Sequence, residues 1–170
     1  MVRIYTKEGD KGFTKLANGY EVPKGHNVIE MCGSLDELSS YLGVVLSSHY
    51  HPDTYTVLYT IQTDLFHFMQ TIQEERAMDK FDERVAYLES QINHFDSYLE
   101  PLEGFLMPNG SKPAADCHYA RAVCRRVERL ATKLFLVKIN AQLSMYLNRL
   151  GDLLFVLARY LNHDKERYFD

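Results

Sequence analysis

Apolar residues recur with the spacing of an α-helix in five successive stretches of this chain, and this pattern limits the fold more than any other feature. The first stretch runs from about Ser34 to Ser48 and carries Leu35, Leu38 and Leu42 on one side. The others cover about residues 52–72, 80–99, 112–137 and 140–162. The links between the first and second helices, and between the fourth and fifth, are too short for anything but antiparallel neighbours. The sequence therefore predicts an all-α fold, an antiparallel five-helix bundle.

The start of the first helix is expected at Ser34, because Glu37 three residues later completes a capping-box pattern. Ahead of it, residues 1–32 contain several glycines and little helical periodicity, which favours an irregular glycine-containing segment. The length of 170 residues suits a single domain with one core. One domain is therefore expected over residues 1–170, with an N-terminal segment 1–32 and a helix bundle 33–162.

The net charge and the cysteine content indicate which partners and which cellular compartment to expect. The formal net charge is −4, so no overall basic field is present to hold nucleic acid or an anionic membrane. No apolar run approaches the ~20 residues that a membrane span needs. Cys32, Cys117 and Cys124 form no CxxC pair, and an odd number argues against a disulfide framework. These features predict a cytoplasmic protein without a nucleic-acid or membrane partner.

The segment TKEGDKGFT, from Thr6 to Thr14, has the residue types of an anion site. Its two glycines allow backbone N–H groups to turn toward an anion, and Lys7 and Lys11 add positive charge. Asp10 is able to hold Mg²⁺ through water. The segment is either a polyphosphate cradle or a plain surface hairpin, because glycine and lysine are also common in exposed loops.

The fourth predicted helix carries a polar stripe formed by Arg121, Arg125 and Glu128, which share one face. Two arginines so placed can bind phosphate, with Glu128 holding a guanidinium in place. The alternative is a solvated face with ion pairs between neighbouring turns. The buried side of this helix is expected to consist of Ala115, Ala122, Val123, Val127 and Leu130.

Three other groups leave both a structural and a functional interpretation open. Asp36, in the first predicted turn, either complements the helix dipole or pairs with an arginine of the fourth helix in this subunit or the next. Asn148 and Asp152 interrupt an apolar helix on one face, as an internal network or as a ligand contact. Phe105, in an apolar triplet between Gly104 and Pro108, belongs to a rigid wall or to a simple connecting loop.

Several catalytic patterns are missing from the chain. It contains no ExxH, HExxH, GxSxG or GxGxxG sequence and no cysteine–histidine cluster with zinc spacing. No protein-held metal is therefore predicted, and the chemistry that remains is the positioning of charged substrates.

Five segments together resemble the PduO-type ATP:cob(I)alamin adenosyltransferases. They are IYTKEGDKGFTKL near the start, GSLDELSSYLG at the first helix, FLMPNGS before the fourth, HYARAVCRRVERL within it and YLNRLGDLLFVLARYLN near the end. The segments span residues 4–162 in the family's order, and their joint occurrence is specific although each alone is modest.

The resemblance implies a homotrimeric five-helix bundle that binds ATP with Mg²⁺ and a reduced corrinoid between subunits. It implies that the cobalt of cob(I)alamin attacks the 5′-carbon of ATP, giving adenosylcobalamin and triphosphate. A flavoprotein reductase and an adenosylcobalamin-dependent enzyme are the further partners that it implies. Two other readings remain: a non-catalytic bundle that senses or carries ATP or a corrinoid, and a purely structural helical oligomer.

Residue roles follow from the same resemblance. It implies that Phe105 displaces the lower ligand of cobalt, that Asn148 contacts the nucleotide near the reacting carbon, and that Asp36 pairs with Arg121 across the interface. The residues that it implies for the triphosphate and nucleotide are Thr6, Lys7, Gly9, Asp10, Thr14, Lys24, Arg121, Arg125 and Glu128. Five positions depart from the family pattern: Val28 stands where an arginine is common, Asn109 where a first glycine is common, Cys32 where a tyrosine is common, Ser39 where an asparagine is common, and Gly151 where a serine is common.

Overall fold

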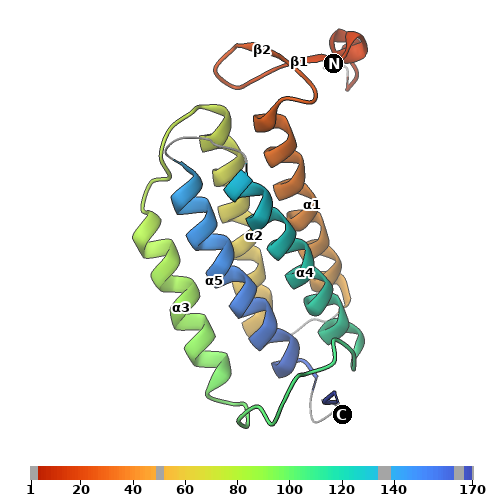
Figure 1. Cartoon of the computed structure of the whole chain (residues 1–170), viewed down its shortest axis with the longest axis vertical. Helices are drawn as coiled ribbons and strands as arrows, with labels where there is room; N and C mark the ends of the chain where they lie inside the picture. The colour runs from red at the N-terminus through yellow and green to blue at the C-terminus, as the bar shows by residue number, and fades with distance from the viewer. Residues whose placement is uncertain (1–3, 49–51, 134–138, 163–166, 170) are drawn as a thin grey trace.

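The computed structural model describes residues 4–48, 52–133, 139–162 and 167–169. Five helices lie side by side, and a small hairpin covers one end of them (Figure 1). The helices are α1 (Asn27–Ser48), α2 (Pro52–Gln73), α3 (Phe81–Asp96), α4 (Lys112–Lys133) and α5 (Ile139–Tyr160). A short 3₁₀ helix, η1 (Glu8–Lys11), precedes the hairpin strands β1 (Phe13–Lys15) and β2 (Glu21–Pro23). This arrangement confirms the predicted all-α bundle with an irregular N-terminal segment.

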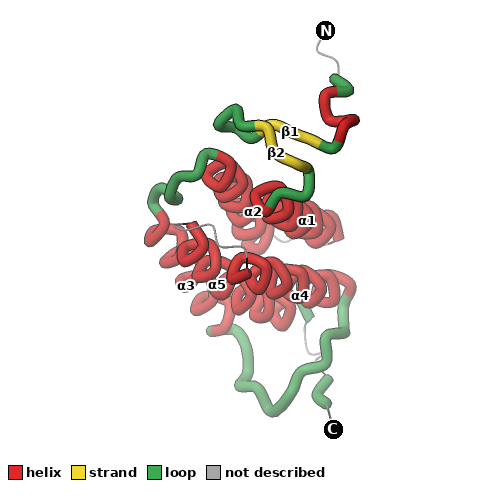
Figure 2. The backbone as a smooth tube through the Cα atoms, turned by 45° about the horizontal axis from the view of Figure 1, so that its top comes forward, coloured by secondary structure: helices red, strands yellow, loops and turns green. Residues whose placement is uncertain are grey.

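The helices form two packed groups. Figure 2 shows α1 and α2 as one pair, while α3, α5 and α4 lie next to one another, with α5 between the other two. Because α5 packs on several neighbours, it is apolar around most of its circumference. Its fully buried side chains are Leu143, Tyr146, Leu147, Leu150, Leu153, Leu154, Leu157 and Ala158.

A buried polar contact joins three helices in the core. Asp64 of α2 is only 3% exposed, and its carboxylate forms an ion pair with Arg84 of α3. The hydroxyl of Tyr146 in α5 donates a hydrogen bond to the same carboxylate at 2.8 Å. Burial raises the pKa of this tyrosine, so it remains a donor at neutral pH. The contact fixes the position of α3 relative to α2 and α5.

The first helix begins earlier than the sequence indicated. It starts at Asn27 rather than Ser34, so the irregular segment ends near residue 26 and not residue 32. The N–H of Val28 donates to Nδ1 of His26 at 3.3 Å, and this ring nitrogen caps the helix. Val28 and Met31 extend the apolar stripe upstream, and the intervening exposed Gly33 concealed the continuity. Ser34 is 6% exposed and lies within the helix, so it is not a cap.

The other predicted helix ends lie within a few residues of the observed ones. The expected end of the fourth helix near Val137 falls outside the described residues. The prediction of the buried side of α4 was partly wrong, because Ala122 is exposed and Ala115 and Leu130 are only half-buried. The buried side instead consists of Ala114, Cys117, His118, Ala120, Val123, Cys124, Val127 and Ala131. Cysteine and alanine are small enough to let α1 and α5 approach this helix closely.

The described cysteines are free, and Cys117 and Cys124 are buried. No helix among the described residues is long and apolar enough to span a bilayer.

Candidate functional site

The N-terminal segment forms an open cavity of about 510 Å³ that lysine and threonine side chains line. Lys7 adopts a left-handed conformation (φ 65°) just before η1, and Gly12 does so (φ 85°) just after it. The chain then enters the antiparallel hairpin, in which Thr14 pairs with Val22. Within this turn the N–H groups of Asp10 and Gly12 donate to the carbonyls of Lys7 and Gly9, so the lysine side chains supply the attraction for an anion. The residues around the cavity are Thr6, Lys7, Glu8, Gly9, Lys11, Phe13, Thr14, Lys15 and Glu21.

Lys24 lies directly against this turn. A Cβ atom placed on Gly9 would lie 3.0 Å from Nζ of Lys24, so the absence of a side chain at position 9 makes room for the ammonium group. The N–H of Lys24 also donates to the carbonyl of Gly12 at 2.9 Å. Lys24 and Gly9, which are distant in sequence, therefore belong to one cationic site. Asp10 is exposed on the same turn.

Arg121 is a half-buried cation on the face that α4 and α5 form. Its guanidinium carbon lies 5.5 Å from the ring centroid of Phe155 on α5. Its buried Nε has no hydrogen-bond partner among the described residues. Burial, and then the charge of Arg125, lower the pKa of Arg121, but a guanidinium stays protonated near neutral pH. A half-buried cation with an unsatisfied donor is prepared for an anionic ligand or partner.

The rest of the predicted stripe continues on the same face. Arg125 is exposed, and its Cγ lies 3.9 Å from the position of a Cβ built on Gly151 of α5. Glu128 accepts a hydrogen bond from Nδ2 of Asn148 at 3.3 Å. The structure thus brings Arg121, Arg125, Glu128 and Asn148 together.

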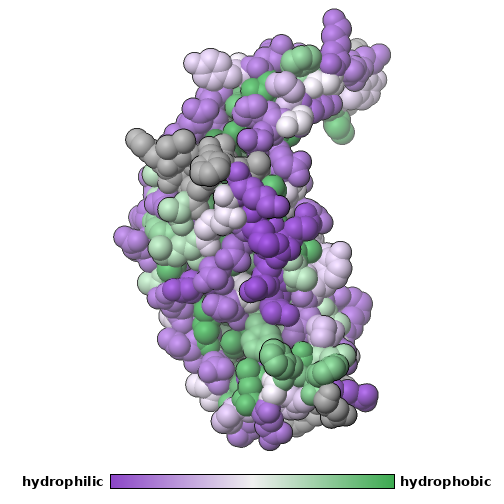
Figure 3. Space-filling model, in the orientation of Figure 1, coloured by the Kyte–Doolittle hydropathy of each residue, from purple (hydrophilic) through white to green (hydrophobic). Residues whose placement is uncertain are grey.

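Asn148 is held from both sides, and it is not part of a buried network. Its Oδ1 accepts a hydrogen bond from Arg149 at 2.8 Å, and Arg149 in turn forms a 2.8 Å ion pair with Glu89 of α3. Asn148 and Asp152 are both exposed, so the polar face of α5 is directed at solvent or a ligand. Figure 3 shows hydrophilic side chains gathered across the middle of the face formed by α4 and α5, with a more hydrophobic area toward the C-terminal end.

Asp36 and Arg121 do not meet within one chain. Cys32 and Ser39, which flank Asp36 at helical spacing, contact α2: Cys32 Sγ donates to the carbonyl of Met69, and the carbonyl of Ser39 accepts from Gln62. Glu37 instead contacts α4, through an ion pair with Arg126. Asp36 therefore lies on the α2 side of α1, whereas Arg121 lies on the α5 side of α4.

The loop with Phe105 lies at the other end of the bundle from the hairpin (Figure 1). Phe105 is 87% exposed. The segment pairs with the C-terminal residues: Leu106 bridges antiparallel to Tyr168, and the N–H of Phe169 donates to the carbonyl of Phe105 at 2.8 Å. This register places Phe105 and Phe169 opposite each other with their side chains on one face of the ribbon. Sequence reasoning missed Phe169, because nothing in the linear pattern connects it with position 105.

Val28 and Asn109, two of the five departures from the family pattern, have structural explanations. Val28 is 2% exposed and belongs to the core, so it does not leave a gap at a ligand site. Gly110, and not Asn109, has the positive φ of the loop (119°), so this turn does not require glycine at position 109.

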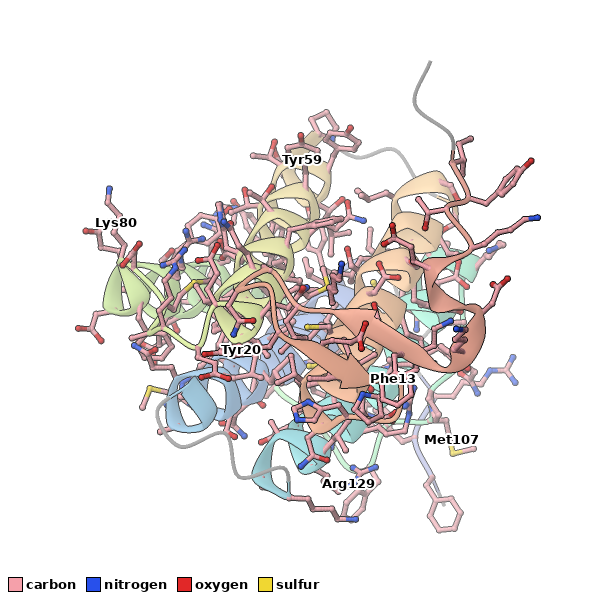
Figure 4. All side chains as sticks on the ribbon, turned by 90° about the horizontal axis from the view of Figure 1, so that it is seen from above. Phe13, Tyr20, Tyr59, Lys80, Met107 and Arg129 are labelled. Carbon is pink, nitrogen blue, oxygen red and sulfur yellow. The ribbon has the colours of Figure 1, made fainter. Side chains whose placement is uncertain are left out.

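Figure 4 views the molecule from the hairpin end. Phe13 of β1 lies over the bundle, Met107 lies away from it, and Arg129 lies at the outer edge of α4. Arg129 is exposed and lies away from the Phe155 ring that Arg121 contacts, which makes it a matched control for Arg121.

A family model described as cobalamin adenosyltransferase matches residues 4–161. The chain belongs to this family. It is 40% identical over 164 residues to a cobalamin adenosyltransferase from Cupriavidus metallidurans, covering 95% of this chain and 89% of that protein. It is 34% identical to the corrinoid adenosyltransferase PduO of Citrobacter freundii, covering 95% of this chain but 50% of that protein.

The fold agrees with that of the cobalamin adenosyltransferase family. A PduO-type ATP:corrinoid adenosyltransferase from Lactobacillus reuteri, solved as a variant with cobalamin and ATP, superposes with a TM-score of 0.88 at 28% identity. The alignment covers 97% of both chains. In one copy of the chain described by the present structure, the hairpin, the α4–α5 face and the Phe105 loop are three separate regions.

Proposed function

We propose that this cobalamin adenosyltransferase transfers the 5′-deoxyadenosyl group of ATP to the cobalt of cob(I)alamin, with Arg121 as the central side chain. The observation that carries the assignment is the half-buried Arg121, which has a buried Nε without a hydrogen-bond partner among the described residues. It lies between Phe155 and the exposed Arg125, on a face that also presents Glu128 and Asn148.

The reaction needs little from the protein except binding and charge stabilisation. Cob(I)alamin supplies the electron pair that forms the cobalt–carbon bond to C5′, and the C5′–oxygen bond of ATP breaks with release of triphosphate. Negative charge accumulates on the leaving group, so fixed cations aimed at it lower the barrier. Arg121 and Arg125 provide such cations on the bundle face, and Lys7 and Lys24 provide them at the hairpin.

The hairpin residues would bind the triphosphate. Thr6, Lys7, Gly9 and Thr14 line the open cavity, and Lys24 reaches the turn at Gly9. We assign Mg²⁺ to the triphosphate itself, with Asp10 as the carboxylate on this turn that would bind the ion through water. No group of three metal-ligating side chains occurs among the described residues.

Glu128 and Asn148 would orient the nucleoside. Their hydrogen bond of 3.3 Å uses Oε1 of Glu128, and both residues have exposed or half-exposed surface. A carboxylate and an amide together match the donors and acceptors of a ribose. Such contacts would hold C5′ in line for attack.

We further propose that the enzyme is a homotrimer and that each site forms between two subunits. The support is geometric: Asp36 faces the α2 side of its own chain, away from its own Arg121, and the hairpin is remote from the Phe105 loop. A neighbouring subunit that supplies Asp36 and its hairpin to the α4–α5 face would complete the site in a closed cyclic assembly.

Phe105 would act on the corrinoid as a steric wedge. Its ring is 87% exposed and lies opposite Phe169, so both rings present apolar surface to a ligand. Displacing the lower axial ligand of cob(II)alamin makes its reduction easier for a cellular electron donor, for which we propose a flavoprotein reductase. The product would pass to an adenosylcobalamin-dependent enzyme. The free thiols fit the reducing cytoplasm, where we place the protein.

The test is turnover under anaerobic conditions. Chemically reduced cob(I)alamin, Mg²⁺ and ATP are mixed with a catalytic amount of protein, and light-sensitive adenosylcobalamin and triphosphate are measured together. The proposal expects many turnovers with one triphosphate released per adenosylcobalamin. Thermal stabilisation by ATP or corrinoid without turnover would instead support a sensor or carrier, because a ligand selective for the native state raises the melting temperature whether or not it reacts.

A further inference from the structure

Asn162 lies just beyond α5 and is 1% exposed. Its Oδ1 accepts the N–H of Ser111 at 2.9 Å, and its Nδ2 donates to the carbonyl of Asn109 at 3.4 Å. Ser111 returns a hydrogen bond, from its hydroxyl to the carbonyl of Leu161 at 2.8 Å. One buried amide thus joins the end of α5 to both sides of the turn that precedes α4.

Gly110 closes this turn over the amide. Its φ of 119° is a conformation that residues with a side chain rarely adopt. A Cβ atom built on it would also lie 1.9 Å from Oδ1 of Asn162. The lack of a side chain at Gly110 therefore leaves space for the amide of Asn162, and the hydrogen bonds of this amide hold the turn in place. We call this contact of Asn109–Ser111 with Asn162 the α5 latch.

The latch continues by backbone hydrogen bonds toward Phe105. The N–H of Asn109 donates to the carbonyl of Met107, and the N–H of Met107 donates to the carbonyl of Arg167, both at 2.8 Å. Phe169 then donates to the carbonyl of Phe105. Because the Phe105 side chain is 87% exposed, the bundle packs little against it, and the backbone sets its position.

We propose that Asn162 is a positioning residue for the displacement of the lower cobalt ligand. It would act through the α5 latch, which holds Phe105 in a fixed position relative to the α4–α5 face. The inference rests on the proposed function and adds to it the residue that aligns the two halves of the site. It follows from the fact that α5 carries both the latch at its end and Asn148 in its middle. Loss of the Asn162 hydrogen bonds would let Phe105 move but would leave the nucleotide contacts at Glu128 and Asn148 in place.

The test compares two assays in each variant: transfer from chemically reduced cob(I)alamin, and transfer from cob(II)alamin with a flavoprotein reductase. Asn162→Ala removes the latch from the α5 side, and Gly110→Ala disturbs it from the loop side. Asn93→Ala, at an exposed position of α3, is the matched control. Melting temperatures are measured first, and assays are run well below the lowest of them.

The proposal expects the cob(II)-dependent rate of Asn162→Ala to fall about tenfold or more, because a misplaced Phe105 displaces the lower ligand less completely. The cob(I)-dependent rate should stay within about twofold, because the nucleotide contacts are unchanged. The visible spectrum of bound cob(II)alamin should retain its lower-ligand form in the variant. If Asn162→Ala does not fold, Gly110→Ala must show the same selective loss.

Two outcomes would overturn the inference, and they are distinguishable. Parallel losses in both assays, or an unchanged ratio, refute the latch while wild-type turnover upholds the proposed function. Absence of wild-type transfer from cob(I)alamin refutes the proposed function itself, and the positioning role with it.

Discussion

Arg121 and Phe155 form a cation–π contact in which the guanidinium carbon lies 5.5 Å from the ring centroid. The contact joins α4 to α5 and orients the arginine without neutralising it, because an aromatic ring carries no formal charge. Burial lowers the pKa of Arg121, and its Nε lacks a hydrogen-bond partner among the described residues. The fold therefore holds this charge in one place and leaves it available.

Replacing the ring should weaken nucleotide binding. Phe155→Leu keeps apolar volume but removes the cation–π contact, which contributes about 0.5–1 kcal/mol at a partly exposed site. The expected result is an increase of about two- to fivefold in KM for ATP with a smaller change in kcat. Steady-state kinetics with varied ATP measure this, and Phe66→Leu, at an exposed position of α2, is the control. An unchanged KM in Phe155→Leu would show that the ring does not orient Arg121.

Arg149 should affect catalytic efficiency with ATP because its hydrogen bond holds Asn148 in place. It donates to Oδ1 of Asn148 at 2.8 Å, and a hydrogen bond of this kind contributes about 0.5–1.5 kcal/mol. Arg149→Met is expected to lower kcat/KM for ATP by about two- to tenfold. Glu89→Gln is the matched control, since it weakens the ion pair with Arg149 but keeps the arginine beside Asn148. Equal effects of the two substitutions would mean that the ion pair, and not the amide contact, is what counts.

The proposed site between two subunits predicts complementation between inactive variants. Asp36→Ala and Arg121→Ala should each be nearly inactive alone. Co-expressed, they should assemble mixed trimers in which about a quarter of the interfaces combine an intact Asp36 with an intact Arg121. Activity recovered in the co-purified mixture, against that of each variant alone, is the measurement. No recovery in verified mixed trimers would place both residues in one chain's site or outside it.

Buried thiols should make the protein sensitive to alkaline pH. Burial, followed by the charge of Asp116, raises the pKa of Cys117 from 9.0 to about 12, and burial also raises the pKa of Cys124. A raised pKa in the folded state gives stability that is complete below the unfolded pKa and is lost as pH rises through the folded one.

The free energy of unfolding should therefore fall between about pH 9 and pH 12, by up to about 1.4 kcal/mol per pH unit for each thiol. Urea unfolding at several pH values measures the slope. Cys117→Ala should remove one thiol's share of it; an identical slope in this variant would rule out Cys117 as a source.

The bundle could be predicted from sequence because helical periodicity is a local property. The start of α1 could not, because Gly33 interrupts the apolar stripe and the cap is a histidine, His26, that no common capping pattern includes. The buried side of α4 was misjudged for a related reason. Cys117 and Cys124 were treated as redox markers, although buried cysteines pack like small apolar residues.

The arrangement of the candidate site residues could be predicted only where they lie on one helix. The shared face of Arg121, Arg125 and Glu128 follows from spacing along α4. Contacts between distant segments, such as Lys24 with Gly9 or Asn162 with Gly110, have no signature in a single sequence. In the proposed trimer the relation of Asp36 to Arg121 depends on a neighbouring subunit, and the family resemblance was the only guide to it.

The most direct test of the central claim is a comparison of Arg121→Ala with Arg129→Ala in the anaerobic cob(I)alamin and ATP assay. Both substitutions remove one arginine from α4, but Arg129 is exposed and lies away from the Phe155 ring that orients Arg121. Removing a cation that stabilises a departing triphosphate should lower kcat by about a hundredfold or more. The account predicts this loss for Arg121→Ala and wild-type turnover for Arg129→Ala. Wild-type turnover by folded Arg121→Ala would contradict it.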